Sequence, residues 1–275
     1  MLNVEFLKEN GVDVEKSLEL FGDMQTYNDT IGEFILGASS KLPKLEEYKN
    51  EKDMNNYAIY AHSLKSDANY FGFAKLAQLA EQEERRAKAG DVYYIYDTYS
   101  ELVEEVDRLI HVIKQYLGTE EVTMVNKTVQ KEETPSNQEI YNEPTILVVD
   151  DSNIVRNFVS KIFNNTYRVA IAEDGKEALE IIKANQDGQN IKAILLDLNM
   201  PNVDGFEVLD YMKENNLLQK MPVSIISGDD KKETIDRAFT YPIVDMIRKP
   251  FNTVDIKQVV EKTIYFGELN KKKED

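Results

Sequence analysis

The sequence lacks cysteine and tryptophan altogether, and its 275 residues include two histidines and seven prolines. Without cysteine the chain can form neither a disulfide framework nor a cysteine-ligated metal site, and it has no thiol nucleophile. Two histidines cannot supply a three-histidine metal site. No apolar run approaches the ~20 residues that span a membrane, and the start, MLNVEFLKENG, lacks the layout of a signal peptide. We therefore expect a soluble cytoplasmic protein.

Basic residues are scarce relative to acidic ones. The chain has 33 Lys and Arg against 50 Asp and Glu, which gives a net charge of −17. Binding to nucleic-acid backbones or anionic membranes draws its affinity from Lys and Arg, so neither partner is expected. At roughly 100–200 residues per domain, the length predicts two domains.

Composition and pattern divide the chain into four parts. Residues 1–118 have helical periodicity, 119–143 are polar without a period, 144–270 alternate between strand and helix patterns, and 271–275 form a charged tail. The middle stretch, TEEVTMVNKTVQKEETPSNQEIYNE, is predicted to be a linker. If flexible, it would span about 25–30 Å.

The first part predicts an antiparallel helix bundle. One apolar helix face is formed by Tyr57, Ala61, Leu64, Ala68 and Phe71. Gly72 and Gly90 interrupt the helical pattern, and a long helix is expected over 92–117. Two shorter helices are expected before Leu42, with breaks at Gly11 and at residues 41–43, which include Pro43.

The part from 144 to 270 predicts an α/β fold, a doubly wound sheet of five parallel strands. Short apolar runs bounded by turn residues lie at 146–149, 169–172, 193–196, 223–226 and 243–247. Stretches with helical periodicity begin near Ser152, Gly175, Gly205, Asp230 and Thr253. Five such β-α units imply a parallel sheet covered by helices on both faces.

Chemically active residues follow four of these strands: Asp150 and Asp151, Asp197, Ser227, and Lys249. A parallel sheet brings these strand ends to one edge, where ligands bind. Three carboxylates there would repel one another unless a cation joined them, and hard oxygen donors favour Mg²⁺. Such a pocket would accept a phosphoryl group on Asp197 as nucleophile, and the metal and Lys249 would offset the charge of its oxygens.

The strings TILVVDDSNIVR, ILLDLNMPNVDGFEVL, IISG and IRKPF, in this order, resemble the receiver domain of bacterial response regulators. The resemblance implies that Asp197 is the phosphoacceptor, and that Asp150 and Asp151 are the acidic pair, with Asp151 a direct Mg²⁺ ligand. Asn199 would be a ligand through its backbone carbonyl, and Asp197 belongs to the same metal site. Ser227 would be the switch hydroxyl and Lys249 would pair with the phosphoryl group, next to a cis Lys249–Pro250 bond. Met246 stands where receivers often carry a switching aromatic residue.

His62 lies outside the apolar stripe of its helix and shares a face with Lys65, Ser66 and Asn69. We expect this face to be solvent-directed and its imidazole to be exposed, largely neutral and nucleophilic at neutral pH. Lys65 would offset the charge of a phosphoryl group on the ring. His111, which has no motif around it, is interpreted as structural.

The string YAHSLKSDANYFG resembles the phosphohistidine motif of histidine-containing phosphotransfer (Hpt) domains, and the resemblance extends along 1–118. It implies that His62 carries a phosphoryl group. The motif usually has Gly four residues after the histidine, where this chain has Ser66, whose hydroxyl would either contact the phosphoryl group or restrict docking.

Together these patterns predict a bacterial two-component phosphorelay protein that is not itself a kinase, with protein contacts as its output. The expected partners are a sensor histidine kinase or other phosphorelay proteins, and a receiver homodimer is allowed. Transfer within one chain and service to separate partners both remain open. Two alternatives are an unphosphorylated scaffold and a metal-dependent phosphatase that forms an aspartyl phosphate. The phosphatase would need an acid two residues after the nucleophile, where this chain has Asn199.

Overall fold

The computed structural model describes residues 2–118, 143–186, 190–229 and 231–274, so the predicted linker lies outside the described residues except for Glu143. The described residues form two compact units, here called the helical unit (2–118) and the α/β unit (143–274). None of the described helices is both long enough and apolar enough to cross a bilayer.

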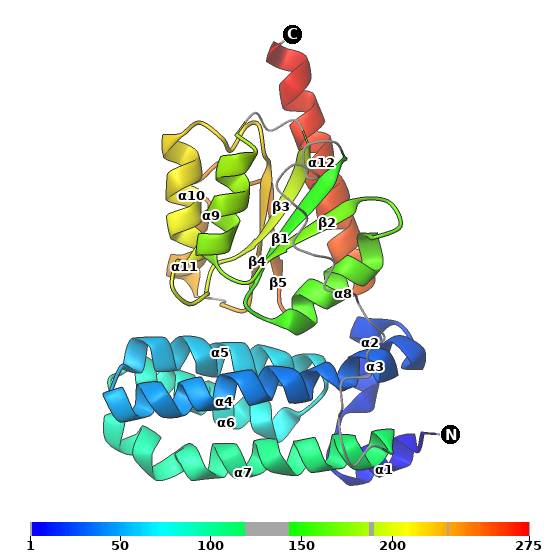
Figure 1. Cartoon of the computed structure of the whole chain (residues 1–275), viewed down its shortest axis with the longest axis vertical. Coiled ribbons are helices and arrows are strands. Elements are labelled where there is room, and N and C mark those ends of the chain that lie inside the picture. The colour runs from blue at the N-terminus through cyan, green and yellow to red at the C-terminus, as the bar shows by residue number, and fades with distance from the viewer. Residues whose placement is uncertain (1, 119–142, 187–189, 230, 275) are drawn as a thin grey trace. The chain divides into compact units, whose positions relative to one another are not determined.

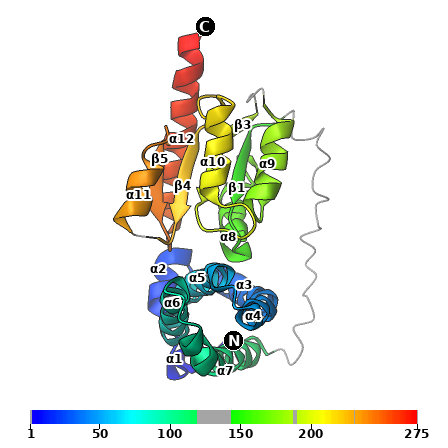
Figure 2. The same ribbon diagram turned by 90° about the vertical axis from the view of Figure 1, so that its left-hand side faces the viewer.

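The helical unit is built on a bundle of four long helices. Its elements are α1 (Val4–Glu9), α2 (Val14–Phe21), α3 (Met24–Ile31), α4 (Glu33–Glu51), α5 (Met54–Tyr70), α6 (Ala74–Lys88) and α7 (Val92–Leu117). α5 packs against α4 and α6, and α7 packs against the same two helices, an arrangement that Figure 2 shows nearly end-on. The predicted apolar stripe of α5 is fully buried. The expected helix bundle is confirmed.

The predicted break at residues 41–43 is wrong, because α4 runs from Glu33 to Glu51 with Pro43 inside it. Three short helices and the start of α4 precede Leu42, where two helices were expected. Proline removes one helical N–H and crowds the preceding turn. Tertiary contacts on both sides of Pro43 outweigh this local preference. Leu45 is buried, and Lys41 forms a buried ion pair with Asp67 of α5, with 2.5 Å between Nζ and Oδ2.

The described residues of the α/β unit form a five-stranded parallel sheet in the order β2-β1-β3-β4-β5. The strands are β1 (Thr145–Val149), β2 (Arg168–Ala172), β3 (Ile191–Asp197), β4 (Val223–Ser227) and β5 (Asp245–Arg248). The helices are α8 (Asn153–Phe163), α9 (Gly175–Ala184), α10 (Gly205–Glu214), α11 (Lys232–Ala238) and α12 (Thr253–Glu274). The predicted doubly wound fold is confirmed, and α12 extends through four residues of the predicted charged tail.

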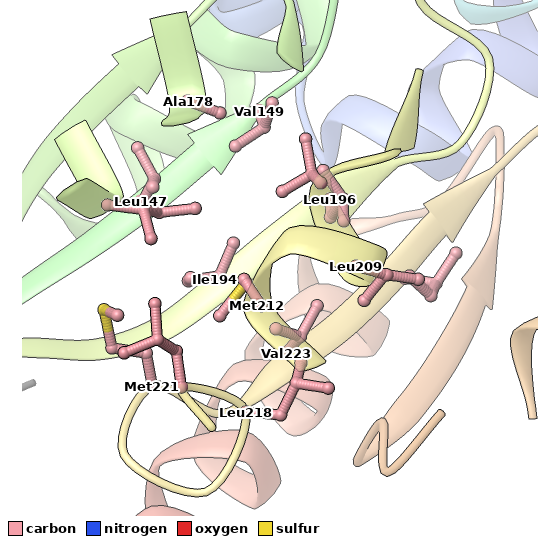
Figure 3. Packing of buried hydrophobic residues seen from close by; sticks show 14 of the residues in the cluster. Leu147, Val149, Ala178, Ile194, Leu196, Leu209, Met212, Leu218, Met221 and Val223 are labelled. Carbon is pink, nitrogen blue, oxygen red and sulfur yellow. The ribbon is translucent and has the colours of Figure 1, made fainter. Parts of the chain in front are cut away.

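Helices cover both faces of the sheet. α9, α10 and α11 lie on one face, and α8 and α12 lie on the other (Figure 1). Leu147 of β1, Ile194 of β3 and Val223 of β4 pack with Leu209 and Met212 of α10 in the core beneath the first face (Figure 3). Nearly all side chains of β1, β3 and β4 are buried and most of them are apolar, which is the pattern of a strand covered on both sides.

Candidate functional site

The strand order places the acidic residues next to one another. The chain leaves β1 toward β2 on one side and later returns to β3 on the other, so β1 and β3 are neighbours at the point where the winding reverses. Asp150 and Asp151 follow β1, and Asp197 ends β3. Each of the three offers a carboxylate oxygen within 4.8 Å of the other two. The predicted meeting of these carboxylates at one sheet edge is therefore present.

Lys249 enters this cluster from the end of β5. Its Nζ lies 2.6 Å from Asp197 Oδ2 and 2.7 Å from Asp150 Oδ2, and its side chain is 3% exposed. The peptide bond between Lys249 and Pro250 is cis, as the resemblance to receiver domains implies. The Lys249 N–H donates to the Ser227 carbonyl at 2.8 Å, which holds the lysine backbone against the end of β4. Four strand ends therefore contribute to one site.

The charges of this site are strongly coupled. Burial raises the pKa of Asp150 to about 7, an effect that Asp197 and Asp151 add to and that Lys249 opposes. Burial alone would lower the pKa of Lys249, but the three carboxylates around it raise that pKa above its ordinary value. A buried ammonium so placed stays protonated at any physiological pH.

The donor set fits a divalent cation. Three carboxylates face one lysine, so acidic groups outnumber basic ones here, and every ligand candidate is a hard oxygen. The raised pKa of Asp150 also shows that a further positive charge would favour its ionised form. Mg²⁺ at Asp150, Asp151 and Asp197 is chemically consistent with this structure.

Two further predicted site residues flank the cluster. The Asn199 N–H donates to Asp197 Oδ1 at 3.2 Å, which orients the aspartate side chain. The Asp229 N–H donates to Ser227 Oγ at 3.1 Å. Because that hydroxyl accepts in this bond, its own hydrogen is left to donate elsewhere.

Gly205 limits the position of the phosphoacceptor candidate. A Cβ at this residue would lie 2.2 Å from the Asp197 carbonyl oxygen and 2.8 Å from Leu198 Cα. Both are backbone atoms, so neither can move aside alone. Gly205 thus lets α10 begin directly against the end of β3.

We expect Gly205→Ala to displace the end of β3, with a loss of about 1–3 kcal/mol in stability and slower phosphorylation of Asp197. Hydrogen exchange of β3 peptides and a labelling time course would measure both effects. Gly32→Ala is the control, since its Cβ would meet only a side-chain carbon at 3.6 Å. If both variants showed the same exchange of β3 peptides and the same labelling rate, the close approach of α10 to β3 at Gly205 would be contradicted.

In the helical unit, His62 meets residues of the neighbouring helix α6. Its Nδ1 lies 3.0 Å from Glu84 Oε1, which also accepts from Lys88 Nζ at 2.5 Å. Glu84 Oε2 accepts from Lys65 Nζ at 2.6 Å. Burial alone would raise the pKa of Glu84, but its bonds to His62, Lys65 and Lys88 hold that pKa well below the usual range.

Within the helical unit, one edge of the imidazole faces a neighbouring helix instead of solvent, because Glu84 of α6 lies against His62 Nδ1. The ionised Glu84 can only accept, so Nδ1 is the donor in this contact, and Nε2 has no hydrogen-bond partner among the described residues. Lys65 is bound to Glu84 instead of standing free. His111 is exposed on α7.

Neither Glu84 nor Lys88 was predicted to be a site residue. Glu84 is 22 residues from His62 and belongs to a run of charged residues, EQEERR, that is typical of a solvated helix face. Only the packing of α5 on α6 decides that Glu84, and not another charged residue of this run, contacts His62. The two residues belong to different helices, so helical periodicity cannot relate their positions.

Comparisons with known proteins address both units. Residues 146–261 match the family model of the response regulator receiver domain, and residues 20–115 match that of the Hpt domain. The rice two-component response regulator ORR3 (Oryza sativa subsp. japonica) is 31% identical over 123 residues, which are 44% of this chain and 92% of the relative. The probable methanogenesis regulatory protein FilR2 of Methanothrix harundinacea is 31% identical over 121 residues, covering 42% of this chain and 78% of the relative.

Solved structures with a similar fold include the chemotaxis protein CheY4 of Vibrio cholerae, at 25% identity and a TM-score of 0.39, covering 43% of this chain and 97% of that one. The receiver domain of the Francisella response regulator 1452 is 28% identical with a TM-score of 0.39, covering 46% and 98%. The family models and the rice relative carry the assignment. The chain belongs to the two-component response regulators, and it joins an Hpt domain and a receiver domain in one polypeptide.

Proposed function

We propose that this protein carries phosphoryl groups between histidine and aspartate in a phosphorelay, with His62 and Asp197 as the two carriers. The observation that carries the proposal is the cluster of Asp150, Asp151, Asp197 and Lys249 at the carboxyl edge of the sheet. In the helical unit, His62 Nε2 has no hydrogen-bond partner among the described residues, which supports the role of His62 as the second carrier.

At Asp197 the reaction forms an acyl phosphate. A carboxylate oxygen attacks the phosphorus of a donor phosphohistidine, the new P–O bond forms and the P–N bond breaks, and its electron pair returns to the imidazole nitrogen. Lys249 lies against Asp197 Oδ2 and would neutralise charge on the transferring group. When bound by Asp150, Asp151, Asp197 and the Asn199 carbonyl, Mg²⁺ would supply further positive charge for the phosphoryl oxygens. The Ser227 hydroxyl would then donate to a phosphoryl oxygen.

At His62 the Nε2 lone pair attacks the phosphorus of an aspartyl phosphate. The P–N bond forms, the P–O bond breaks, and its electron pair returns to the carboxylate of the donor. Phosphorylation leaves the ring with a positive charge while Nδ1 keeps its hydrogen. Glu84, 3.0 Å from Nδ1, would stabilise that charge. Glu84 is therefore a positioning residue, and Lys65 would serve the phosphoryl group only after leaving Glu84.

The donor is a sensor histidine kinase or another phosphorelay protein, and the output is a protein contact. Transfer between the two units of one chain and transfer to separate partners are both compatible with this chemistry. A receiver homodimer, a cytoplasmic location, a bacterial source, the absence of a nucleic-acid partner and the domain boundaries given above stay predictions. The phosphatase alternative is disfavoured because Asn199 cannot act as an acid.

The test is to incubate the full chain with Mg²⁺ and acetyl phosphate and to follow its intact mass. We expect one acid-stable, alkali-labile phosphoryl group that is absent from Asp197→Ala, and acid-labile label on His62 that also depends on Asp197. Mixing His62→Ala chains with Asp197→Ala chains separates the routes, because label on His62 then requires transfer between molecules. If neither residue accepts a phosphoryl group from acetyl phosphate or from any histidine kinase, the scaffold alternative replaces this proposal.

A further inference from the structure

A hydroxyl group lies one helical turn after His62 on α5. Ser66 occupies the position where the phosphohistidine motif usually has Gly. Residues four apart share one face of a helix, and every Cα–Cβ bond tilts toward the helix N-terminus. The Ser66 side chain therefore leans toward His62, not away from it.

This hydroxyl is free. Several other hydroxyl groups in the helices of this chain donate to a backbone carbonyl one turn earlier, as Thr30, Ser40 and Thr263 do at 2.6, 2.8 and 2.6 Å. Such back-bonding is the usual state of a Ser or Thr within a helix. Ser66 Oγ makes no hydrogen bond with any described residue. Its hydrogen is therefore not committed to another side chain or to the backbone of the described residues.

The other polar groups of this face are already occupied. Glu84 holds the Nδ1 edge of the imidazole, and the same carboxylate binds Lys65 and Lys88. His62 Nε2 and Ser66 Oγ are thus two unpartnered polar atoms that lie one turn apart on α5.

We propose that the Ser66 hydroxyl donates a hydrogen bond to a phosphoryl oxygen carried by His62 Nε2 and thereby stabilises the phosphohistidine. The contact is non-covalent, so the hydroxyl keeps its proton and the P–N bond is unchanged. This proposal rests on the proposed function of His62 and adds a positioning residue to it. A hydrogen bond to a charged group of this kind corresponds to about a tenfold effect on an equilibrium.

The experiment measures how phosphoryl groups partition between His62 and Asp197 at equilibrium in the full chain. Removing the hydroxyl in Ser66→Ala should lower the ratio of phosphohistidine to phosphoaspartate about tenfold, speed hydrolysis of the phosphohistidine and shift its ³¹P resonance. Ser66→Gly should lower the ratio equally. Ser63→Ala is the matched control, because Ser63 Oγ is also buried and unpartnered but points about 100° around the helix from His62.

The equilibrium ratio separates the hydroxyl from steric effects, since better or worse docking changes the transfer rate and not the partition. A ratio unchanged in Ser66→Ala, or a ratio that Ser63→Ala lowers equally, would overturn the role of Ser66. Ser66→Gly with a ratio at or above that of wild type would overturn it as well. If His62 of the wild-type chain never carries label from any donor, the proposed function of His62 fails first, and that result is distinguishable from all the others.

Discussion

Replacing Lys249 by methionine is expected to slow phosphorylation of Asp197 by at least about a hundredfold and to destabilise the α/β unit by about 3–5 kcal/mol. The lysine Nζ contacts Asp150 Oδ2 and Asp197 Oδ2 at 2.7 and 2.6 Å. Methionine keeps most of the side-chain volume and removes the charge. The carboxylates of Asp150, Asp151 and Asp197 would then face one another without a protein counter-charge.

Hydrogen exchange of peptides from β1 and β3 measures this loss in the α/β unit alone, which is necessary because a two-unit chain need not unfold in one step. Mg²⁺ should protect the variant more than the wild type, since a bound cation restores the missing positive charge. Lys262→Met is the control. Its ion pair with Asp245 is equally short, at 2.7 Å, but the lysine side chain is 58% exposed, so about 0–1 kcal/mol is expected.

A Lys249→Met chain that is phosphorylated at the wild-type rate would show that the lysine is purely structural. A variant that loses no protection in β1 and β3 would show instead that the carboxylates are protonated in the native state. The two measurements therefore separate the catalytic role of the ammonium from its structural role.

Glu84→Gln is expected to slow phosphoryl transfer to His62 by about ten- to a hundredfold and to destabilise the helical unit by about 2 kcal/mol at pH 7. The amide keeps the size of the side chain and loses its charge. The phosphorylated imidazole then lacks the anion opposite Nδ1, and Lys65 and Lys88 lose their shared partner. Transfer from a phosphorylated receiver and hydrogen exchange of α5 peptides measure the two effects.

The pH dependence of this variant has a definite sign. Because the folded-state pKa of Glu84 is depressed, its stabilisation is present above the unfolded-state pKa of about 4.3 and is lost as the pH falls from there toward the folded-state pKa. The stability difference between wild type and Glu84→Gln should therefore be constant near neutral pH and shrink below about pH 4. A difference that does not change with pH would mean that the carboxylate is not ionised in the native protein.

The neighbouring Glu83 provides a matched control with the opposite trend. It accepts from the hydroxyls of Tyr57 and Thr98 and has no bond to His62, and its burial raises its pKa. A raised pKa means that its favourable contribution is present at low pH and is lost as the pH rises through the folded-state value. Glu83→Gln should therefore leave transfer to His62 unchanged and become less destabilising, relative to wild type, as the pH increases.

The fold of the α/β unit was predictable because its order of strand and helix patterns along the sequence is compatible with one simple architecture, a parallel sheet. Short apolar runs separated by helical periods imply a parallel sheet, and in such a sheet any residue that ends a strand lies at one edge. The proximity of Asp150, Asp197 and Lys249 follows from this topology alone, with no knowledge of helix rotation. The cis bond at Pro250 followed from the resemblance.

The helical unit was less predictable because facing residues there depend on how helices are rotated and offset against each other. Periodicity correctly identified the buried stripe of α5, which is a property of one helix. It did not indicate that Glu84 lies against His62, and it predicted a break at Pro43 that buried packing on both sides of the proline prevents. Each error came from treating one helix as if its neighbours were absent.

The sequence by itself determined that this chain has two units, that one is a helix bundle and the other a doubly wound sheet, and which residues are candidates for phosphoryl chemistry. Only the tertiary structure decided that Glu84 and not another acidic residue of α6 meets His62, and that Lys65 binds this carboxylate. The physical reason is that strand ends in a parallel sheet converge by topology, whereas a contact between two helices depends on side-chain packing along their whole length.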